Sequence, residues 1–142
     1  MSKKYSSPDK QHRVALVYEG EIRFGPAYYR IEIDGWQLPD KLCGEKLFWS
    51  PDSRYLALEE WLTTQESEGP VTRLLLVDLA TMKAAAFETL EGGFLENVRF
   101  LDGGVFYVKR FPATGKGSET EVDYSHISNW SSFGLHPSTT RE

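Results

Sequence analysis

Cysteine is nearly absent from this chain of 142 residues, which contains only Cys43. A disulfide bond within the chain is therefore excluded, and so is a zinc site built from several cysteines. The three histidines, His12, His126 and His136, are not spaced so that two of them share one face of a strand or a helix. We expect neither a bound metal nor another cofactor.

Long hydrophobic runs are also missing. A membrane-spanning helix needs about 18 or more apolar residues, and no stretch of the sequence approaches that length. Lysines stand near the N-terminus, but no apolar segment follows them, so residues 1–8 do not resemble a secretory signal. With a single cysteine, these features predict a cytoplasmic protein without a membrane partner.

Patterns typical of catalysis are absent as well. The sequence has no Gly-x-Ser-x-Gly motif, and no general base can be assigned to Cys43, which is better interpreted as a packed thiol. Gly115-Lys116-Gly117-Ser118 resembles a phosphate-binding loop only in part, because Arg110 occupies the place of the first glycine and no helix is expected to follow. We expect a flexible loop there and predict that the chain is not an enzyme.

Positive charge is in short supply. The chain has 16 Lys and Arg residues against 21 Asp and Glu residues, which gives a net charge of -5. Nucleic-acid binding needs a positive field, so this balance argues against a nucleic-acid partner. A basic protein partner is compatible with it, because opposite fields steer association. The same charge also serves simply to keep a small domain soluble.

Aromatic residues are plentiful, with 8 Phe, 7 Tyr and 4 Trp, and their side chains favour the half-buried surface of a sheet. Short apolar or alternating runs, separated by turn-forming residues, predict strands throughout the chain. Two of these runs are apolar almost throughout, which predicts burial on both faces; they are 55–58 and 73–79. The other runs are 13–18, 28–33, 47–49, 98–101, 105–109 and 121–127.

Two polar segments at the ends of the chain, 1–12 and 131–142, are expected to be tails that flank a single β domain over 13–130. Loops are expected at 63–70 and 112–120, which are polar or rich in glycine. Residues 82–87 are rich in alanine, which favours a helix. So short a segment does not form a stable helix alone, and its position in a hairpin favours a strand.

Two turns have a clear chemical signature. Asp34-Gly35 lies between alternating runs, and both residue types tolerate the positive φ that a tight hairpin requires. In Ser50-Pro51-Asp52-Ser53, proline presets φ while serine and aspartate can bond nearby backbone groups. Both turns predict antiparallel hairpins.

The segment 48–58, Phe-Trp-Ser-Pro-Asp-Ser-Arg-Tyr-Leu-Ala-Leu, resembles the Trp-Ser-Pro-Asp-Gly blade motif of TolB-like and WD-like β-propellers. The better match covers 46–88, and 94–127 is a poorer copy. Ser53 stands where the motif has glycine, and the Gly-His and Trp-Asp signatures of WD repeats are absent. The resemblance implies that the motif forms the turn between the first two strands of a blade.

A closed propeller needs about four or more blades, and this chain offers about two and a half units of blade length. We therefore expect an all-β fold whose antiparallel sheets form an incomplete propeller or a two-sheet sandwich. Its open edge strands would favour pairing with another chain, and closure by oligomerisation is an alternative.

Acidic residues gather in two places. Glu66 and Glu68 lie in the predicted loop 63–70, and a second group alternates along residues 119–123. An acidic β protein of this size is generally similar to bacterial immunity proteins, which bind and inhibit a cognate toxin, often a nuclease with a basic cleft. That similarity implies that the acidic groups mimic phosphates. The predicted partner-binding residues are Glu59, Glu60, Trp61, Glu66, Glu68, Glu119, Glu121 and Asp123.

Two alternatives to this interpretation stay open. The acidic groups are also what a merely solvated surface would show. The chain is also compatible with a propeller-like scaffold or an interaction subunit of a larger assembly.

Overall fold

The computed structural model describes residues 2–23, 25–132 and 136–137. In this part of the chain the only helical segments are two turns of 3-10 helix, η1 (Glu66–Glu68) and η2 (Tyr124–His126). The all-β prediction is therefore confirmed. The strands are β1 (Ser2–Ser6), β2 (Arg13–Glu21), β3 (Ala27–Ile33), β4 (Trp36–Gln37), β5 (Cys43–Trp49), β6 (Tyr55–Trp61), β7 (Val71–Asp78), β8 (Lys83–Ala86), β9 (Leu90–Glu91), β10 (Phe94–Leu101), β11 (Gly104–Phe111), β12 (Lys116–Asp123), β13 (Ser131–Ser132) and β14 (His136–Pro137). Neither helical turn among the described residues has the length and apolar character that a membrane span requires.

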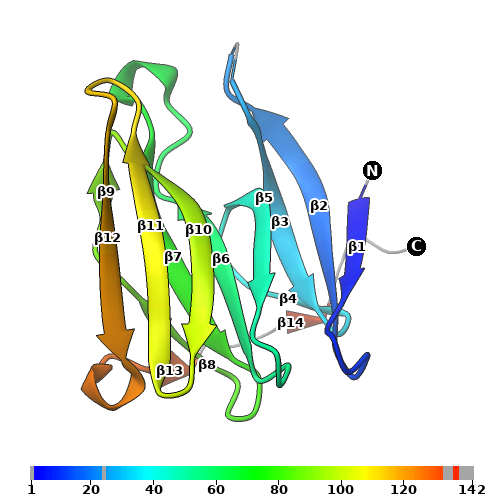
Figure 1. The fold of residues 1–142 in the computed structure, drawn as a ribbon. Coiled ribbons are helices and arrows are strands. Elements are labelled where there is room, and N and C mark those ends of the chain that lie inside the picture. Colours follow the sequence, from blue (N-terminus) through cyan, green and yellow to red (C-terminus); the bar gives the residue numbers. More distant parts are fainter. Residues whose placement is uncertain (1, 24, 133–135, 138–142) are drawn as a thin grey trace.

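The strands form two antiparallel sheets. The larger sheet has the order β1-β2-β3-β5-β6-β7-β8-β13, with short pairings of β4, β9 and β14, and the smaller one is β10-β11-β12. A single residue pair, Tyr29 with Cys43, links β3 to β5. Figure 1 shows β10, β11 and β12 in front of β6 and β7, with β1, β2 and β3 to their right. As predicted, the sheets stack without closing into a barrel.

Strands β6 and β7 lie at the centre and are buried on both faces, as their apolar runs predict. On one face Leu56 and Leu75 join a core cluster with residues of β2 and β3. On the other face Ala57 and Leu74 join a second cluster with residues of β10 and β11. Because successive side chains of a strand point to opposite faces, these two strands contribute to both cores at once.

Strands β5 to β8 follow one another as neighbours in the sheet, and they cover the segment that resembles a propeller blade. The predicted strand at 82–87 is present as β8. The relationship to propellers itself stays a prediction.

The turn at 50–53 joins β5 to β6 and is held by side-chain hydrogen bonds. Ser50 Oγ donates to Asp52 Oδ1 at 2.6 Å and accepts the backbone N–H of Tyr55 at 2.8 Å. Ser53 has a φ of 65°, in the left-handed region that favours glycine. Its hydroxyl accepts the backbone N–H of Asp9 at 2.9 Å, which gives this serine a role that glycine cannot fill.

The N-terminal segment differs from its prediction as a tail. Residues 2–6 form β1, which pairs with β2 from Ser2 opposite Val17 to Ser6 opposite Arg13. Tyr5 faces inward and packs against the core, while the exposed residues alternate with it. Polar composition hid this strand, because only one of its two faces needs apolar side chains.

Two further predictions are corrected at the other end of the chain. Ser131–Ser132 pairs with β8 and His136–Pro137 with β4, so these residues are strands and not part of a tail. The rest of the predicted C-terminal tail, 133–135 and 138–142, lies outside the described residues. The predicted loop 112–120 is shorter than expected, since β12 begins at Lys116 and pairs with β11 along its whole length. Backbone pairing forms this strand although its side chains are mostly polar.

Candidate functional site

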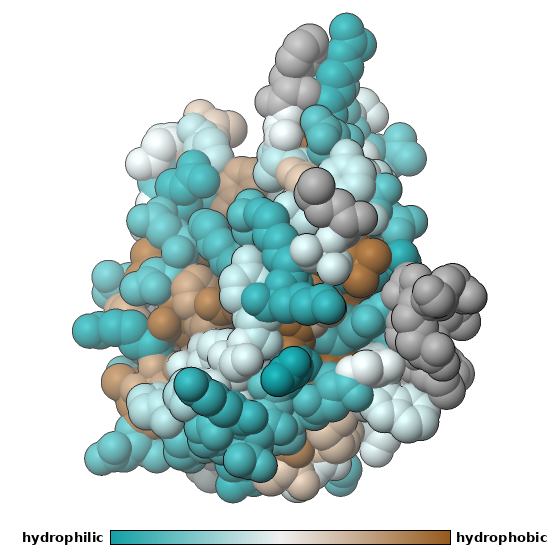
Figure 2. Space-filling model, turned by 90° about the vertical axis from the view of Figure 1, so that its right-hand side faces the viewer, coloured by the Kyte–Doolittle hydropathy of each residue, from teal (hydrophilic) through white to brown (hydrophobic). Residues whose placement is uncertain are grey.

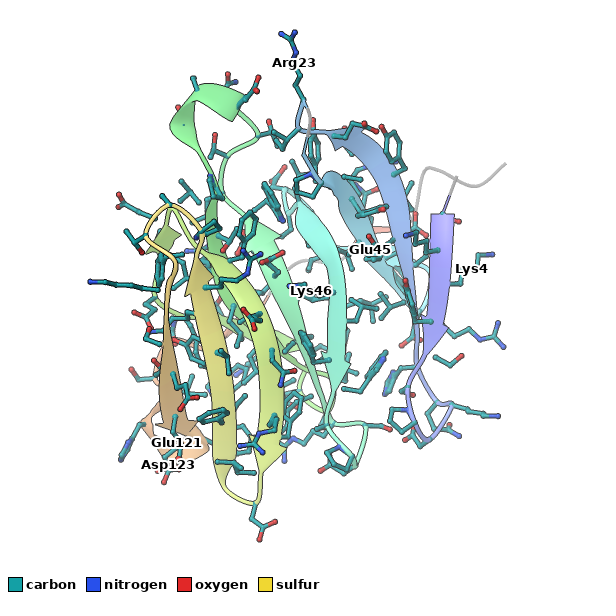
Figure 3. All side chains as sticks on the ribbon, turned by 45° about the horizontal axis from the view of Figure 1, so that its top comes forward. Lys4, Arg23, Glu45, Lys46, Glu121 and Asp123 are labelled. Atoms are coloured by element: carbon teal, nitrogen blue, oxygen red, sulfur yellow. The ribbon has the colours of Figure 1, made fainter. Side chains whose placement is uncertain are left out.

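Three carboxylates lie on the outer face of β12, and we call them the acidic edge: Glu119, Glu121 and Asp123. They are exposed, and they alternate with Thr120 and Val122, which are half-buried. β12 pairs with β11 on one side and with no strand among the described residues on the other. Figure 3 shows Glu121 and Asp123 at the lower end of β12. The shared face that their spacing predicts is therefore present.

The acidic edge keeps its charge largely unpaired. Within the described part of the chain, Glu119 and Glu121 have no ion pair and no side-chain hydrogen bond. Asp123 Oδ1 accepts the hydroxyl of Ser125 at 2.7 Å and the backbone N–H of Ser125 at 2.8 Å. These two hydrogen bonds lower the pKa of Asp123, which keeps its carboxylate ionised at neutral pH.

The second acidic group is also exposed. Glu66 and Glu68 belong to η1, in the loop between β6 and β7, and neither carboxylate has an ion pair among the residues described. Figure 1 shows this loop at the upper left, on the side of the molecule where β9 and β12 run. The loop is at the upper end of the molecule, whereas Glu121 and Asp123 lie at the lower end of β12, so the two acidic groups are not brought together. Glu91 of β9 is exposed as well, and sequence reasoning missed it because its pairing with β7 has no local signal.

The remaining three predicted partner-binding residues are not on the surface. Glu59, Glu60 and Trp61 are only 4%, 5% and 7% exposed, because both faces of β6 are covered. The prediction that they present an acidic surface to a partner is therefore wrong for the folded chain. Glu60 Oε1 accepts Arg73 Nε at 2.8 Å, and Lys41 Nζ lies 3.3 Å from Glu60 Oε2. The negative charge of Glu60 is therefore balanced by Arg73 and Lys41 inside the molecule.

Glu59 points to the opposite face of β6 and lines a cavity of about 500 Å³, together with Gly44, Lys46, Phe94 and Arg110. Glu59 Oε2 accepts the backbone N–H of Leu95 at 2.8 Å. Burial raises the pKa of Glu59, while the hydrogen bond from Leu95, the nearby cationic groups and the indole of Trp61 act in the opposite direction. In such surroundings the neutral form of a carboxyl group is favoured over the charged form more strongly than it is in water.

Irregular strand pairing shapes this cavity. The register of β5 against β6 shifts between Cys43 and Leu47, and that of β10 against β11 shifts between Leu95 and Asn97. Such bulges bend a strand and redirect its side chains. The cavity residues come from β3, β5, β6, β10 and β11, so no local pattern in the sequence signals the site.

Cys43 is buried, in agreement with its interpretation as a packed thiol. Burial, and then the nearby carboxylates of Glu59 and Glu60, raise the pKa of Cys43 far above its ordinary value. A thiol in this state is a poor nucleophile.

No protein-family model, no curated protein and no solved structure matches this chain, so its function has to be inferred from the geometry of its own residues.

Proposed function

We propose that this chain is a non-enzymatic binding protein of the immunity type, which blocks a bacterial toxin by covering a basic surface of that toxin. The observation that carries the proposal is the acidic edge: an edge strand with unpaired carboxylates on its outer face. The proposed partner surface comprises Glu119, Glu121 and Asp123, and the exposed Glu66 and Glu68 form a second acidic group at the other end of the molecule.

The geometry of β12 suits a basic target in two ways. Alternate residues of a strand are about 7 Å apart, so the acidic edge is a straight row of evenly spaced negative charges. A nuclease cleft that binds a row of phosphates offers positive groups to such a row. The unpaired backbone groups of an edge strand also offer hydrogen bonds to an extended segment of a partner.

The charge of this surface predicts how binding depends on salt. Opposite fields raise the association rate, and added salt screens them. Exposed charges such as those of the acidic edge therefore change mainly the rate at which the complex forms, whereas buried contacts change mainly the rate at which it dissociates.

The test is made with the product of the neighbouring open reading frame, if that product is toxic. Co-expression of this chain should restore growth, and the purified pair should form a complex whose association slows as salt rises. The double variant Glu119→Lys and Glu121→Lys should lower the association rate by about tenfold or more. Equal rates and equal protection by this variant would remove the acidic edge from the proposal.

A matched control is Glu21→Lys. Glu21 is an exposed carboxylate at the end of β2, on the other side of the molecule from β12. This variant makes one of the two charge changes at a distant place, so it should bind nearly as fast as the wild type. A similar loss for Glu21→Lys would indicate that net charge matters and that the acidic edge does not.

The second candidate is a propeller-like scaffold or interaction subunit. Two edge strands favour this function: β1 ends the larger sheet and β12 ends the smaller one, and each has a free edge among the described residues where another chain could pair. Figure 2 views the molecule from the side of β1 and shows a mostly hydrophilic face with small hydrophobic patches. Self-association measured by light scattering, together with no effect on a neighbouring toxin, would favour this function over the first.

A further inference from the structure

The cavity beside Glu59 has no part in the function proposed above. It lies where the start of β3, the bulge of β5, the end of β6, the start of β10 and the end of β11 meet. Its volume of about 500 Å³ is within the range of small-molecule sites in proteins. Trp61, Phe94, Pro26 and Ala27 form its apolar walls.

The cavity has hydrogen-bond donors that are free or only partly used. The indole Nε1 of Trp61 is buried and makes no hydrogen bond of regular geometry among the described residues, although the carboxyl group of Glu59 lies near it. Such a donor is rare, and it loses free energy unless something accepts from it. Lys46 Nζ makes one hydrogen bond, to the carbonyl oxygen of Leu95 at 3.0 Å, and Arg110 Nε lies 3.4 Å from Glu96 Oε1. Both cationic groups have further donors to offer.

Acceptors are less available. Glu59 Oε2 is occupied by the Leu95 backbone N–H, Glu59 Oε1 lies near the indole of Trp61, and burial favours the neutral form of this carboxyl group. Glu45, the other acidic residue of the lining, is paired with Lys3. The lining is therefore complementary to a group that accepts hydrogen bonds and carries negative charge.

Aromatic rings define the other half of the ligand. The rings of Trp61 and Phe94 are 5.8 Å apart between centroids and tilted by 58°. The guanidinium carbon of Arg110 lies 5.2 Å from the centroid of Phe94. The two rings are in contact with each other and form one apolar wall, against which a flat ring can pack in a tilted or offset arrangement.

We propose that this cavity is a binding site for a small aromatic carboxylate, with its ring against Trp61 and Phe94 and its carboxylate at Arg110 and Lys46. Phenylacetate serves as the probe. Phenylacetamide has the same shape without the charge, and phenethylamine reverses the charge. These three molecules separate recognition of the anion from simple filling of an apolar space.

The experiment measures the affinity of the whole chain for each probe by calorimetry, at one pH and one ionic strength. Phenylacetate should bind about tenfold or more tightly than phenylacetamide, because hydrogen bonds to charged groups are stronger than neutral ones. Phenethylamine should bind more weakly still. Equal binding of all three, tighter binding of the amine, or no saturable binding of phenylacetate would overturn the proposal.

Arg110→Met tests the anion contact, and Arg99→Met is its matched control. Arg99 lies over Phe106 at 4.9 Å, much as Arg110 lies over Phe94, but it does not line the cavity. Arg110→Met should weaken the binding of phenylacetate by about tenfold and leave the binding of phenylacetamide nearly unchanged. An equal effect of Arg99→Met would contradict the site. The probe series on the unmodified chain decides the matter if a variant fails to fold, and it requires no toxin, so its failure is distinct from failure of the proposed function.

Discussion

Glu59 Oε2 accepts the backbone N–H of Leu95 at 2.8 Å, and this hydrogen bond joins central strand β6 to the bulge of β10 in the other sheet. Leu95 is completely buried, so its N–H has no access to water. Lys46 binds the carbonyl oxygen of the same residue. The side chains of Glu59 and Lys46 thus satisfy the backbone of Leu95 at a point where regular strand pairing is interrupted.

The Glu59–Leu95 hydrogen bond predicts the effect of truncating the side chain. Glu59→Ala leaves a buried N–H without an acceptor and should lower the free energy of unfolding by about 1–3 kcal/mol, measured by urea denaturation. Glu66→Ala is the control, since Glu66 is exposed, and it should change stability by less than about 0.5 kcal/mol. Similar stabilities for the two variants would show that the hydrogen bond is unimportant.

Glu59 also predicts a dependence of stability on pH. Burial raises the pKa of Glu59 above its ordinary value of 4.5, so the folded chain holds this proton more tightly than the unfolded chain. The resulting stabilisation is fully present below the unfolded pKa and is lost as pH rises through the folded pKa. The stability difference between the wild type and Glu59→Gln should therefore shift in favour of the wild type on going from pH 7 to pH 4. A constant difference across this range would contradict the prediction.

The conformation of Ser53 leads us to expect different stabilities for two small substitutions. Its φ of 65° is strained for any residue with a Cβ, and its hydroxyl accepts the N–H of Asp9. Ser53→Ala loses the acceptor and keeps the strain, so it should destabilise by about 1 kcal/mol. Ser53→Gly loses the acceptor but relieves the strain, and it should be more stable than Ser53→Ala by about 1 kcal/mol. Thermal unfolding of the two proteins measures this order, and the reverse order would mean that the left-handed φ carries no strain.

The alternating burial along β1 predicts that substitutions at two neighbouring residues change the stability by different amounts. Tyr5 packs against the core, whereas Lys4 is exposed. Tyr5→Ala should lower the free energy of unfolding by about 1–3 kcal/mol in urea denaturation, because apolar area leaves the core. Lys4→Ala should have little effect. If both variants matched the wild type, β1 would contribute nothing to stability.

The burial of Cys43 predicts that its thiol is protected from reagents in the folded chain. It is 1% exposed, and burial raises its pKa, so little thiolate is present at neutral pH. A thiol reagent such as Ellman's reagent should react with the native chain only as slowly as the chain opens, and rapidly in urea. Rapid reaction in the native state would show that the contact between β3 and β5 opens easily.

Local chemistry allowed much of the fold to be predicted from the sequence. Asp34-Gly35 has the positive φ values that its hairpin needs, 52° and 84°. In the turn at 50–53, Ser50 and Asp52 bond nearby backbone N–H groups as predicted, and the apolar runs of β6 and β7 are buried on both faces. Each of these features depends on residues close together in the chain, so the local sequence is enough to predict it.

Exposure of the acidic residues was predictable only in part. The spacing of Glu119, Glu121 and Asp123 on one strand correctly implied a shared face. Glu59 and Glu60 look alike in the sequence, but β10 covers one of them and Arg73 with Lys41 neutralises the other. No spacing within 59–61 shows which distant strands will cover it.

The sequence by itself determined most of the longer strands, the turns at 34–35 and 50–53, the two-faced burial of β6 and β7, and the acidic balance of the chain. Only the tertiary structure decided that three of the predicted partner residues are interior, that β1 belongs to the sheet, and that a cavity forms beside Glu59. Periodicity and turn chemistry are properties of adjacent residues, whereas burial and cavities arise where segments distant in the chain pack together.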